Sequence, residues 1–466
     1  MSQPHEHEEE DPVLQDEDIV EVYNEEDDDN VPMDEDDDDN AQYDGEIIIG
    51  GPGPGEEEEM MDMERHEDNS WGVTALHGAQ QSIFTLSLHP LFPNPPIAVS
   101  GGEDDLGFIF SPIPAQSAGG VNSETFPPVR LTGHTDSVVA AGWSFDGEMV
   151  ATGGMDGRVR VWKRVKARRG SQEVQAESAD SWRDWEFLTN LETGSEIQWV
   201  TWHPKGNVLS AGCEDSSVWL WNLPSGNTLT VLSSHTLAST AGLFPPPTAR
   251  QLLTSSLDSS LILWEISSSA PAFKSSIFTA AGNPELDPAQ HGITSLAVAP
   301  NGQLAAVGGA GGRVRLVSLP KGDTVGRLEG HAERESVEAL IFVDLLAGAG
   351  GGKGVVLVSA GTDGKGFVWD VATGRVRAEL VHNEPITSLA AHPAPHLHLV
   401  TSASADGTLK TWDVRTGALV AEHKGHTGVV NGVAVASYPL QEGEEGKLGQ
   451  VVVSAGDEGV SLIWRI

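Results

Sequence analysis

Several features that define other classes of protein are scarce in this chain. Its single cysteine, Cys213, excludes a framework of intrachain disulfides and fits a reducing compartment. No run of 18 apolar residues occurs, so the sequence contains no candidate transmembrane helix. The N-terminus is acidic and lacks an apolar h-region, so we expect no signal peptide. Together these absences predict a soluble, cytoplasmic protein.

Positive charge is scarce as well. The 466 residues contain 27 Lys or Arg against 69 Asp or Glu, which gives a formal net charge of −42. Such a chain repels phosphate backbones, which argues against direct nucleic-acid binding. It attracts basic proteins or basic peptides instead. The sequence therefore predicts a partner rich in Lys and Arg.

The acidic residues concentrate at the N-terminus. Residues 1–70 hold 30 Asp or Glu and one base, Arg65. Runs of like charge repel themselves and bury little, so we expect a disordered acidic tail over 1–70. Two roles stay open for this tail: it keeps the chain soluble, or it competes for or helps to gather a basic partner.

From residue 71 onward the sequence repeats. The clearest unit, Leu131 to Lys163, has a Gly-His pair followed by three alternating strand patterns, with turns at Asp146-Gly147 and Asp156-Gly157. Five units share one spacing, in which a hydroxyl lies four residues before an acid and a Trp lies six residues after it. These sets are His134, Thr152, Asp156 and Trp162; His235, Thr254, Asp258 and Trp264; His331, Ser359, Asp363 and Trp369; His382, Ser402, Asp406 and Trp412; and His426, Ser454, Glu458 and Trp464.

Three further units are degenerate. The first has His77, Ser100 and Asp104 but Phe110 in place of Trp; the third keeps only Asp215 and Trp221; the fifth keeps His291 but has Gly311 and Val317. Counting them gives eight units. Seven would follow only if the fifth, which still has the full pattern of strands and turns, were not a blade.

These units resemble the WD-repeat family over residues 71–466. The resemblance implies an all-β fold, an eight-bladed WD40 β-propeller, with the disordered acidic tail before it. It also implies that His, Ser or Thr, Asp and Trp form a buried hydrogen-bonded network within each blade, which supplies donors to a buried acid. The last unit ends after its third strand, so residues 71–76 are expected to close the last blade as its fourth strand.

No catalytic set is apparent. The histidines are spread one per unit, His396 and His398 lack a Cys or carboxylate cluster that would make a zinc site, and no phosphate-binding loop occurs. We therefore expect no enzyme, no metal and no cofactor. The basic start of the insertion at 163–187 is interpreted as a solvated loop, with nuclear localisation or nucleic-acid binding as the alternative. Residues 345–354 and 437–450 are expected to be further loop insertions.

A binding face follows from the resemblance. In the WD-repeat family the loop with the His and the turn with the acid open on the same face, around the central channel. The residues beside these markers form our predicted partner-binding set: Glu103, Asp136, Met155, Glu196, Glu214, Leu257, Glu335, Glu384 and Asp457. Crowded carboxylates repel one another until a Lys/Arg-rich segment arrives. The alternative is that these acids merely follow the acidic composition.

Particular stretches resemble one branch of the family. Three stretches are similar to angio-associated migratory cell protein and its fungal counterparts: the acidic tail with DIVEV, ALHGAQQSIFTLSLHP and AVSGGEDDLGFIF. The resemblance implies a ribosome-assembly chaperone. Its fungal members capture the basic N-terminal segment of one large-subunit ribosomal protein, the tenth in the eukaryotic naming. We expect the chain to be a monomer and its partner to be this basic segment. A WD-repeat scaffold for signalling or for histone and chromatin complexes is the alternative.

Overall fold

The computed structural model describes residues 67–114, 126–166, 182–278, 287–348, 354–439 and 448–466. The chain divides into two units, Met1–Met63 and Glu64–Ile466. The predicted disordered tail lies outside the described residues, except for its last four positions.

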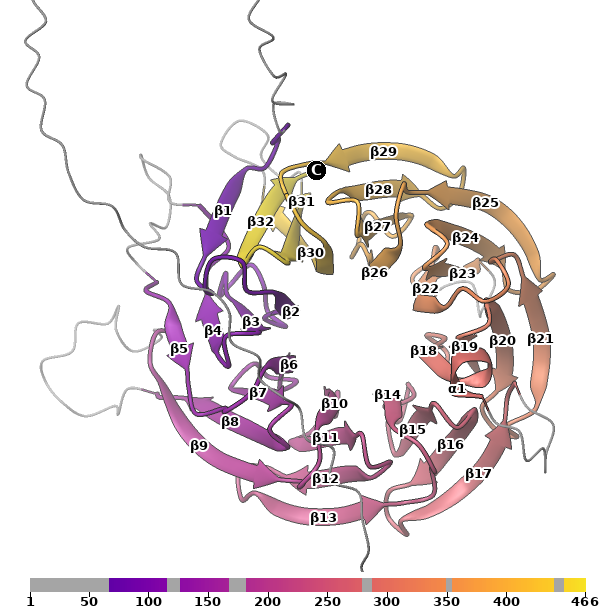
Figure 1. Cartoon of the computed structure of the whole chain (residues 1–466), viewed down its shortest axis with the longest axis horizontal. Helices are drawn as coiled ribbons and strands as arrows, with labels where there is room; N and C mark the ends of the chain where they lie inside the picture. Colours follow the sequence, from indigo (N-terminus) through magenta and orange to yellow (C-terminus); the bar gives the residue numbers. More distant parts are fainter. Residues whose placement is uncertain (1–66, 115–125, 167–181, 279–286, 349–353, 440–447) are drawn as a thin grey trace, which may run out of the picture. The chain divides into compact units, whose positions relative to one another are not determined.

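The second unit is an eight-bladed β-propeller (Figure 1). Its described residues form eight four-stranded antiparallel sheets, and a single short helix, α1 (Pro288–His291), precedes the fifth blade. The predicted fold class is confirmed, including the blade made by the degenerate fifth unit. Blade 1 is β2–β5, blade 2 β6–β9, blade 3 β10–β13, blade 4 β14–β17, blade 5 β18–β21, blade 6 β22–β25, blade 7 β26–β29, and blade 8 β30–β32 with β1.

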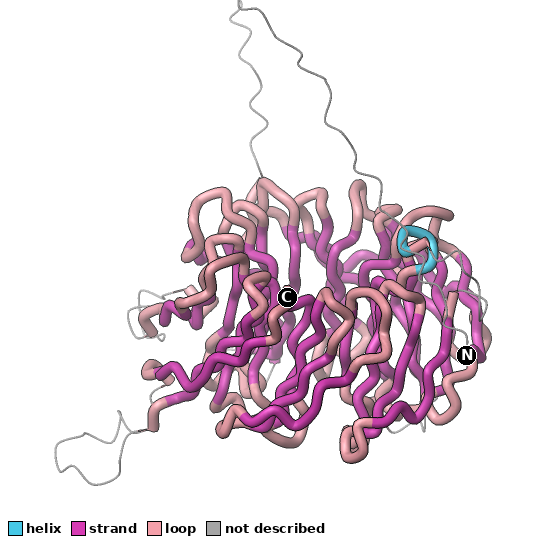
Figure 2. Tube along the Cα trace, turned by 60° about the horizontal axis from the view of Figure 1, so that its bottom comes forward, coloured by secondary structure: helices cyan, strands magenta, loops and turns pink. Residues whose placement is uncertain are grey.

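The four strands of each blade lie side by side in order from the central channel to the outer wall, and the loops gather on the two opposite faces (Figures 1 and 2). The innermost strands are β2 (Ile83–Leu88), β6 (Val138–Trp143), β10 (Ile197–Trp202), β14 (Ser239–Leu243), β18 (Ile293–Val298), β22 (Val337–Asp344), β26 (Ile386–Ala391) and β30 (Val430–Pro439). The second strands are β3 (Ala98–Gly102), β7 (Met149–Gly154), β11 (Val208–Cys213), β15 (Gln251–Ser256), β19 (Leu304–Gly309), β23 (Val355–Gly361), β27 (Leu399–Ser404) and β31 (Leu448–Gly456).

The third strands are β4 (Gly107–Phe110), β8 (Arg158–Arg164), β12 (Val218–Asn222), β16 (Ser260–Glu265), β20 (Arg313–Ser318), β24 (Lys365–Asp370), β28 (Leu409–Asp413) and β32 (Val460–Arg465). The outer strands are β5 (Val129–Leu131), β9 (Trp185–Glu192), β13 (Asn227–Leu232), β17 (Ala270–Ser276), β21 (Thr324–Glu329), β25 (Arg375–Val381), β29 (Ala418–His423) and β1 (Gly72–Ala75). Second strands such as β7 are buried throughout, because neighbouring blades cover both faces, whereas outer strands such as β25 are mostly exposed.

The apolar core lies between the blades. Met149 and Val161 of blade 2 pack with Trp202 and Leu209 of blade 3, and each other pair of adjacent blades shares a cluster of the same kind. Because every blade buries its faces against two neighbours, closing the ring covers the faces of the first and last blades that would otherwise stay exposed.

Ring closure joins the two ends of the propeller. Strand β1 pairs antiparallel with β32, with Gly72 opposite Ile463 and Ala75 opposite Val460. Asn69, three residues before this strand, adds a further contact: its side-chain carbonyl oxygen accepts from the backbone N–H of Lys424 at 2.8 Å. The N-terminal strand thus supplies the fourth strand of blade 8 and leaves no unpaired edge on β32.

Two of the expected loops are shorter than the sequence suggested. Strand β8 continues to Arg164 and β9 begins at Trp185, so only the middle of 163–187 is left outside the strands. Likewise, β30 runs to Pro439 and β31 begins at Leu448, which places both ends of 437–450 in a long hairpin. The central residues of both insertions, 167–181 and 440–447, lie outside the described residues.

Cys213 ends β11 and is buried, and burial raises the pKa of its thiol. No helix in the described ranges is long and apolar enough to cross a membrane. Across the same ranges, no group of three or more His, Cys, Asp or Glu is arranged to hold a metal ion.

Candidate partner-binding face

One backbone hydrogen bond recurs in all eight blades and fixes which loops lie on the same face of the propeller. The residue before the acid position donates its N–H to the carbonyl of the residue that precedes the innermost strand, at 2.9–3.1 Å. The eight pairs are Glu103–Ser82, Met155–Ser137, Glu214–Glu196, Leu257–Ala238, Ala310–Gly292, Thr362–Ser336, Ala405–Pro385 and Asp457–Val429. This bond ties the turn between the second and third strands to the loop that enters the blade. Both therefore lie on one face, around the central channel.

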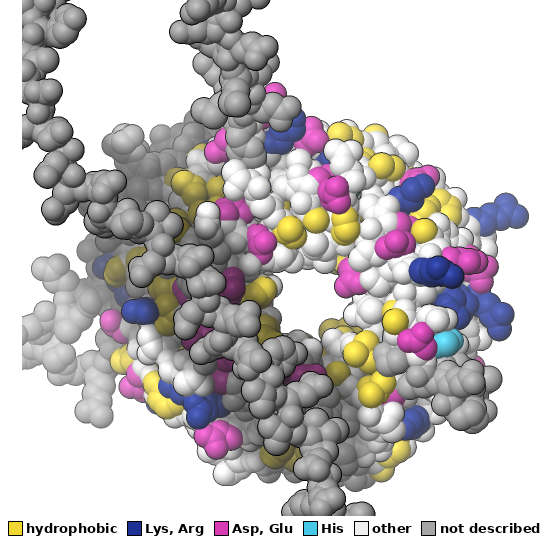
Figure 3. Space-filling view, viewed as in Figure 1, with side chains coloured by type: hydrophobic (Ala, Val, Ile, Leu, Met, Phe, Trp, Pro, Cys, Tyr) yellow, Lys and Arg dark blue, Asp and Glu magenta, His cyan; other side chains and the backbone are white. Residues whose placement is uncertain are grey.

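All nine residues of the predicted binding set lie on this face, which we call the mouth. Glu103, Asp136, Met155, Glu214 and Glu384 are exposed there. The remaining four, Glu196, Leu257, Glu335 and Asp457, are half-buried. Figure 3 shows Asp and Glu near the central opening of this face, whereas Lys and Arg lie mostly farther out.

The carboxylates are concentrated on one side of the mouth, not spread evenly as the sequence suggested. Five of the seven predicted acids lie in blades 8, 1, 2 and 3: Asp457, Glu103, Asp136, Glu196 and Glu214. The other four blades carry two, Glu335 and Glu384, and their turn positions are the neutral Leu257, Ala310, Thr362 and Ala405. We call the side formed by blades 8 and 1–3 the acidic arc.

At one end of the acidic arc, blades 8 and 1 share a polar cluster. The side chain of Glu103 accepts from the backbone N–H of Ser82 at 3.1 Å, and the Ser82 hydroxyl donates to Asp457. Asn431 donates to the same Asp457 oxygen at 3.3 Å and to the Ile83 carbonyl at 3.1 Å. These bonds hold two carboxylates in place at the rim and leave Glu103 exposed to solvent.

At the other end, two glutamates of blade 3 face each other. A hydrogen bond shared with Glu214 is the main reason why the pKa of Glu196 is raised, and the negative charges of Glu214 and Asp136 raise it further. Both residues line a depression of about 330 Å³ together with Met155. This site combines crowded negative charge with an exposed thioether, which suits a basic side chain with a long apolar stem.

On the opposite side, the two predicted acids are more isolated. Glu335 accepts a hydrogen bond from the Thr362 hydroxyl at 2.6 Å, so part of its charge is already compensated. Glu384 is exposed in the loop before β26. The binding set is thus brought to one face, but only its members on the acidic arc form close groups.

Sequence reasoning missed two carboxylates of the acidic arc. Asp215 is exposed because the third unit has no histidine to bury it, and Asp105 lines a second depression in blade 1. The missing histidine was a readable signal for Asp215. The signal for Asp105 was an acid at the turn position where most units have Gly.

The complete units hold their histidines in buried networks below the mouth. In blade 7, His382 Nδ1 lies 3.0 Å from Asp406, and Nε2 lies 2.8 Å from the Ser402 hydroxyl, which also accepts the Trp412 indole N–H at 2.9 Å. Burial by itself raises the pKa of Asp406, but hydrogen bonds from His382 and Thr408 outweigh it and hold that pKa well below its usual range. Blade 6 repeats the arrangement with His331, Ser359, Asp363 and Trp369.

Two other networks differ from the predicted pattern. In blade 4, His235 Nδ1 bonds the Ser260 hydroxyl at 2.6 Å, while the nearest oxygen of Asp258 is 3.7 Å away. In blade 2, no hydrogen bond among the described residues joins Trp162 to Thr152, so the indole lies outside the network. The bonds that do follow the prediction join His134 to Thr152 and Asp156, and His235 and Trp264 to Thr254.

In blade 8 the indole is redirected by ring closure. His426 lies 2.5 Å from both Glu458 and Ser454, as the spacing predicted. Trp464, however, donates to the side chain of Asn69 at 3.0 Å and not to Ser454. The closing segment therefore takes part in the last network, a contact between residues 395 positions apart that no local spacing could indicate.

The degenerate units are filled in different ways. In blade 1, His77 bonds Ser100 and Asp104, both at 2.8 Å, although Phe110 replaces the Trp. In blade 5 the assignment of His291 was wrong. A Cβ built on Gly309 would meet the ring of Phe278 at 2.6 Å, whereas the equivalent glycine of blade 2 faces its network histidine. Phe278 thus fills the histidine position, and the acid that a histidine would bind is absent.

A family model for the WD domain, G-beta repeat, matches residues 126–163, 285–318 and 374–413, and one for the anaphase-promoting complex subunit 4 WD40 domain matches 168–241. An uncharacterised WD repeat-containing protein of Schizosaccharomyces pombe is 31% identical over 331 residues, which cover 71% of this chain and 73% of the relative. The chain belongs to the WD-repeat family.

The branch predicted from the sequence is also found. Angio-associated migratory cell protein of Homo sapiens is 29% identical over 335 residues, which cover 69% of this chain but only 65% of that relative. Among solved structures, Sqt1 of Chaetomium thermophilum, bound to the N-terminus of the ribosomal protein L10, superposes with a TM-score of 0.67 at 25% identity. That match covers 86% of this chain and 100% of the solved chain.

Proposed function

We propose that this WD-repeat protein is a ribosome-assembly chaperone that works in the cytoplasm. It captures the basic N-terminal segment of a newly made large-subunit ribosomal protein, the counterpart of L10, on the mouth of its propeller. It acts by binding and not by catalysis, as a monomer that takes one partner. The observation that carries the proposal is the acidic arc, and the likeness to an Sqt1 solved with this kind of ligand supports it.

The chemistry of capture follows from charges held close together. In the free protein the neighbouring Glu214 raises the pKa of Glu196, because two adjacent carboxylates repel each other. A Lys or Arg side chain placed between them relieves this repulsion and gains charge-assisted hydrogen bonds to both. Glu103 and Asp457 offer a second pair of acceptors at the other end of the arc, so an extended basic segment can be held at two points.

Capture should also be fast. Carboxylates on a concave rim focus their field on the channel mouth and steer a cationic segment toward it. An exposed ion pair contributes only about 1 kcal/mol or less by itself, so affinity has to come from several pairs acting together. Shielding the basic segment in this way would keep it from other polyanions until assembly.

The test uses the full-length protein and a fluorescent peptide with the basic N-terminal sequence of ribosomal protein L10. We expect one-to-one binding that weakens steeply with salt, because each contact is electrostatic. Glu103→Lys, Glu214→Lys and Asp457→Lys should each weaken it by about tenfold, since reversal replaces one attraction of about 1 kcal/mol with a repulsion.

Asp323→Lys is the matched control. Asp323 is an exposed acid in the turn between β20 and β21, on the face opposite the mouth, so its reversal changes the net charge equally and should leave binding unchanged. If the three mouth variants bind the peptide as tightly as this control, the mouth is not the capture site. If histone peptides bind more tightly than the L10 peptide, the scaffold alternative for chromatin complexes is favoured.

A further inference from the structure

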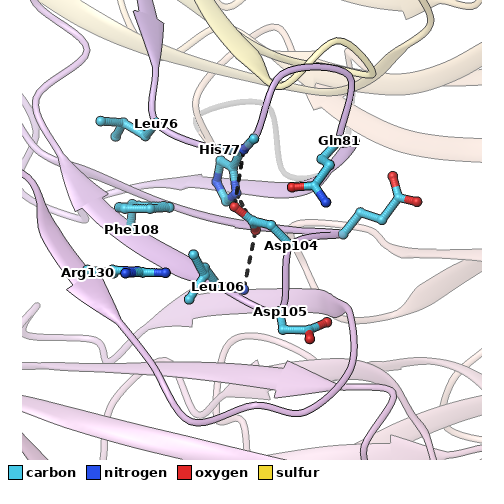
Figure 4. A pocket seen from close by; sticks show the side chains of 10 residues that line it. Leu76, His77, Gln81, Asp104, Asp105, Leu106, Phe108 and Arg130 are labelled. Atoms are coloured by element: carbon cyan, nitrogen blue, oxygen red, sulfur yellow. Dashed lines mark hydrogen bonds and ion pairs between the residues drawn. The ribbon is translucent and has the colours of Figure 1, made fainter.

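A second depression lies in blade 1, beside the mouth. It has a volume of about 630 Å³ and is open to solvent on one side. Leu76, Leu106 and Phe108 give it an apolar wall, and Asp104 and Asp105 lie on the other side of these residues (Figure 4). Glu103 also lines the depression. A cavity with an apolar wall and acids along one side suits a long cationic side chain better than a bare charge.

Two of the three acids already have partners inside the protein. Asp104 binds His77 Nδ1 at 2.8 Å and belongs to the network of blade 1. Glu103 accepts from the backbone N–H of Ser82 at 3.1 Å. Asp105 differs, because no described residue forms a hydrogen bond or ion pair with its carboxylate. Its acceptor capacity is free to bind a guest in the pocket.

Asp105 also has a left-handed backbone conformation, which favours glycine over a residue with a side chain. Its φ is +60°, at the turn position where Gly157 of blade 2 and Gly407 of blade 7 have φ values of +72° and +74°. A side chain in this left-handed region costs on the order of 1 kcal/mol relative to glycine. Burial, followed by the charges of Asp136 and Asp104, also raises the pKa of Asp105. A bound cation would relieve the electrostatic part of this cost, and the backbone strain would remain.

The opposite wall holds a positive charge. Arg130 pairs with Phe108 across strands β4 and β5 and lines the pocket on its outer side (Figure 4). A cationic side chain in the pocket is repelled from this wall and attracted to the acids, so its charged end is oriented toward the acids. The charge of Arg130 also disfavours a second cation beside the first.

We infer that this pocket is an anchor site for one arginine side chain of the captured basic segment. The guanidinium binds Asp105 and the hydrocarbon stem lies against Leu106 and Phe108. This inference rests on the proposed function and adds a specific position to it. Arginine fits better than lysine because its planar, weakly hydrated guanidinium can bind a carboxylate through two N–H groups while it lies against an aromatic side chain.

The backbone at Asp105 permits an unusually clean test. Asp105→Gly removes the carboxylate and at the same time relieves the left-handed strain, so the variant should melt at the same temperature as the parent or higher. We expect it to bind the L10 peptide about tenfold more weakly. Ser216→Gly is the matched control. Ser216 has a φ of +75° at the equivalent turn of blade 3, so its replacement should stabilise the fold without weakening binding.

A set of peptides in which each arginine is replaced by lysine, one at a time, identifies the guest. One replacement should weaken binding to the parent protein and have no further effect on Asp105→Gly, because both changes remove the same contact. Arg130→Gln should tighten binding about twofold to threefold, since it removes the repulsion from the outer wall.

The possible outcomes separate the two proposals. If Asp105→Gly binds as the parent does while Glu214→Lys still loses affinity, the anchor pocket is refuted and the capture function stands. If no single arginine couples to Asp105, or lysine replaces it without loss, the arginine assignment is wrong. If the parent protein does not bind the L10 peptide at all, the proposed function fails and the anchor site fails with it.

Discussion

Three buried histidines outside the WD networks predict how stability depends on pH. His89, His392 and His423 are each no more than 3% exposed, and burial lowers the pKa of each ring to about 4. His392 bonds Gln450 and Thr401, and the Thr401 and Thr411 hydroxyls continue this chain to His423. All three rings are therefore neutral in the folded protein at pH 5.5.

The magnitude follows from the difference between folded and unfolded pKa values. An unfolded histidine has a pKa of about 6.5, so below this pH the unfolded chain takes up protons that the folded chain refuses. The contribution of the three neutral rings to the free energy of unfolding is complete above pH 6.5 and is lost progressively as the pH falls toward 4. At pH 5.5 each ring costs about 1.4 kcal/mol, and the three together lower the free energy of unfolding by about 4 kcal/mol relative to pH 7.5. This value depends mainly on the unfolded pKa, because the folded rings stay neutral at pH 5.5 for any folded pKa below about 5.

Urea unfolding followed by tryptophan fluorescence at pH 7.5 and pH 5.5 measures this difference. The double variant His392→Gln and His423→Gln should reduce it by about 2.7 kcal/mol, because two of the three rings are removed. His291→Gln, at the half-buried histidine of α1, should leave it unchanged. Equal free energies of unfolding at the two pH values would refute the argument that these rings are held neutral by burial.

Two further predictions concern the networks and the closure of the ring. Asp363→Ala should lower the free energy of unfolding by about 3–5 kcal/mol, because it leaves the buried His331 and the backbone N–H groups of Ala332 and Lys365 without their acceptor. Asp215→Ala, which alters the exposed acid of the third unit, should change it by less than about 0.5 kcal/mol in the same urea titration; equal losses in both variants would show that the network adds nothing. Asn69→Ala removes the acceptor of the Trp464 indole and should cost about 2 kcal/mol. Its melting temperature should fall accordingly, and an unchanged value would mean that β1 closes the ring without help from this residue.

Much of the fold could be predicted because its signals are local. The fixed distances from hydroxyl to acid to Trp reflect one turn and two paired strands, so they survive in the linear sequence. The mouth was predicted from the resemblance to the WD-repeat family, in which the turn with the network acid opens on that face. The count of eight blades followed even for the fifth unit, because its strand and turn pattern persists where its polar network is gone.

The errors arise where packing and strand pairing, which no motif spacing indicates, decide the outcome. Phe278 fills the histidine position of blade 5 from a segment that shows no motif, so His291 was assigned there wrongly. Trp464 turns to Asn69 because the closing strand brings that amide beside it. The strands that extend into the insertions at 163–187 and 437–450 were missed because pairing with a neighbouring strand, not local propensity, sets their length.

The amino-acid sequence by itself determined the repeat, the network residues, the acidic balance and the absence of a cysteine framework, because each depends on composition or on spacing within one unit. Only the tertiary structure decided which carboxylates meet. Glu103 and Asp457 lie 354 positions apart but share Ser82, and Asp105 stands alone in its pocket because its neighbours are already bonded. Closing a ring brings the first and last units side by side. Motif spacing within one unit cannot indicate a contact between residues so far apart in the chain.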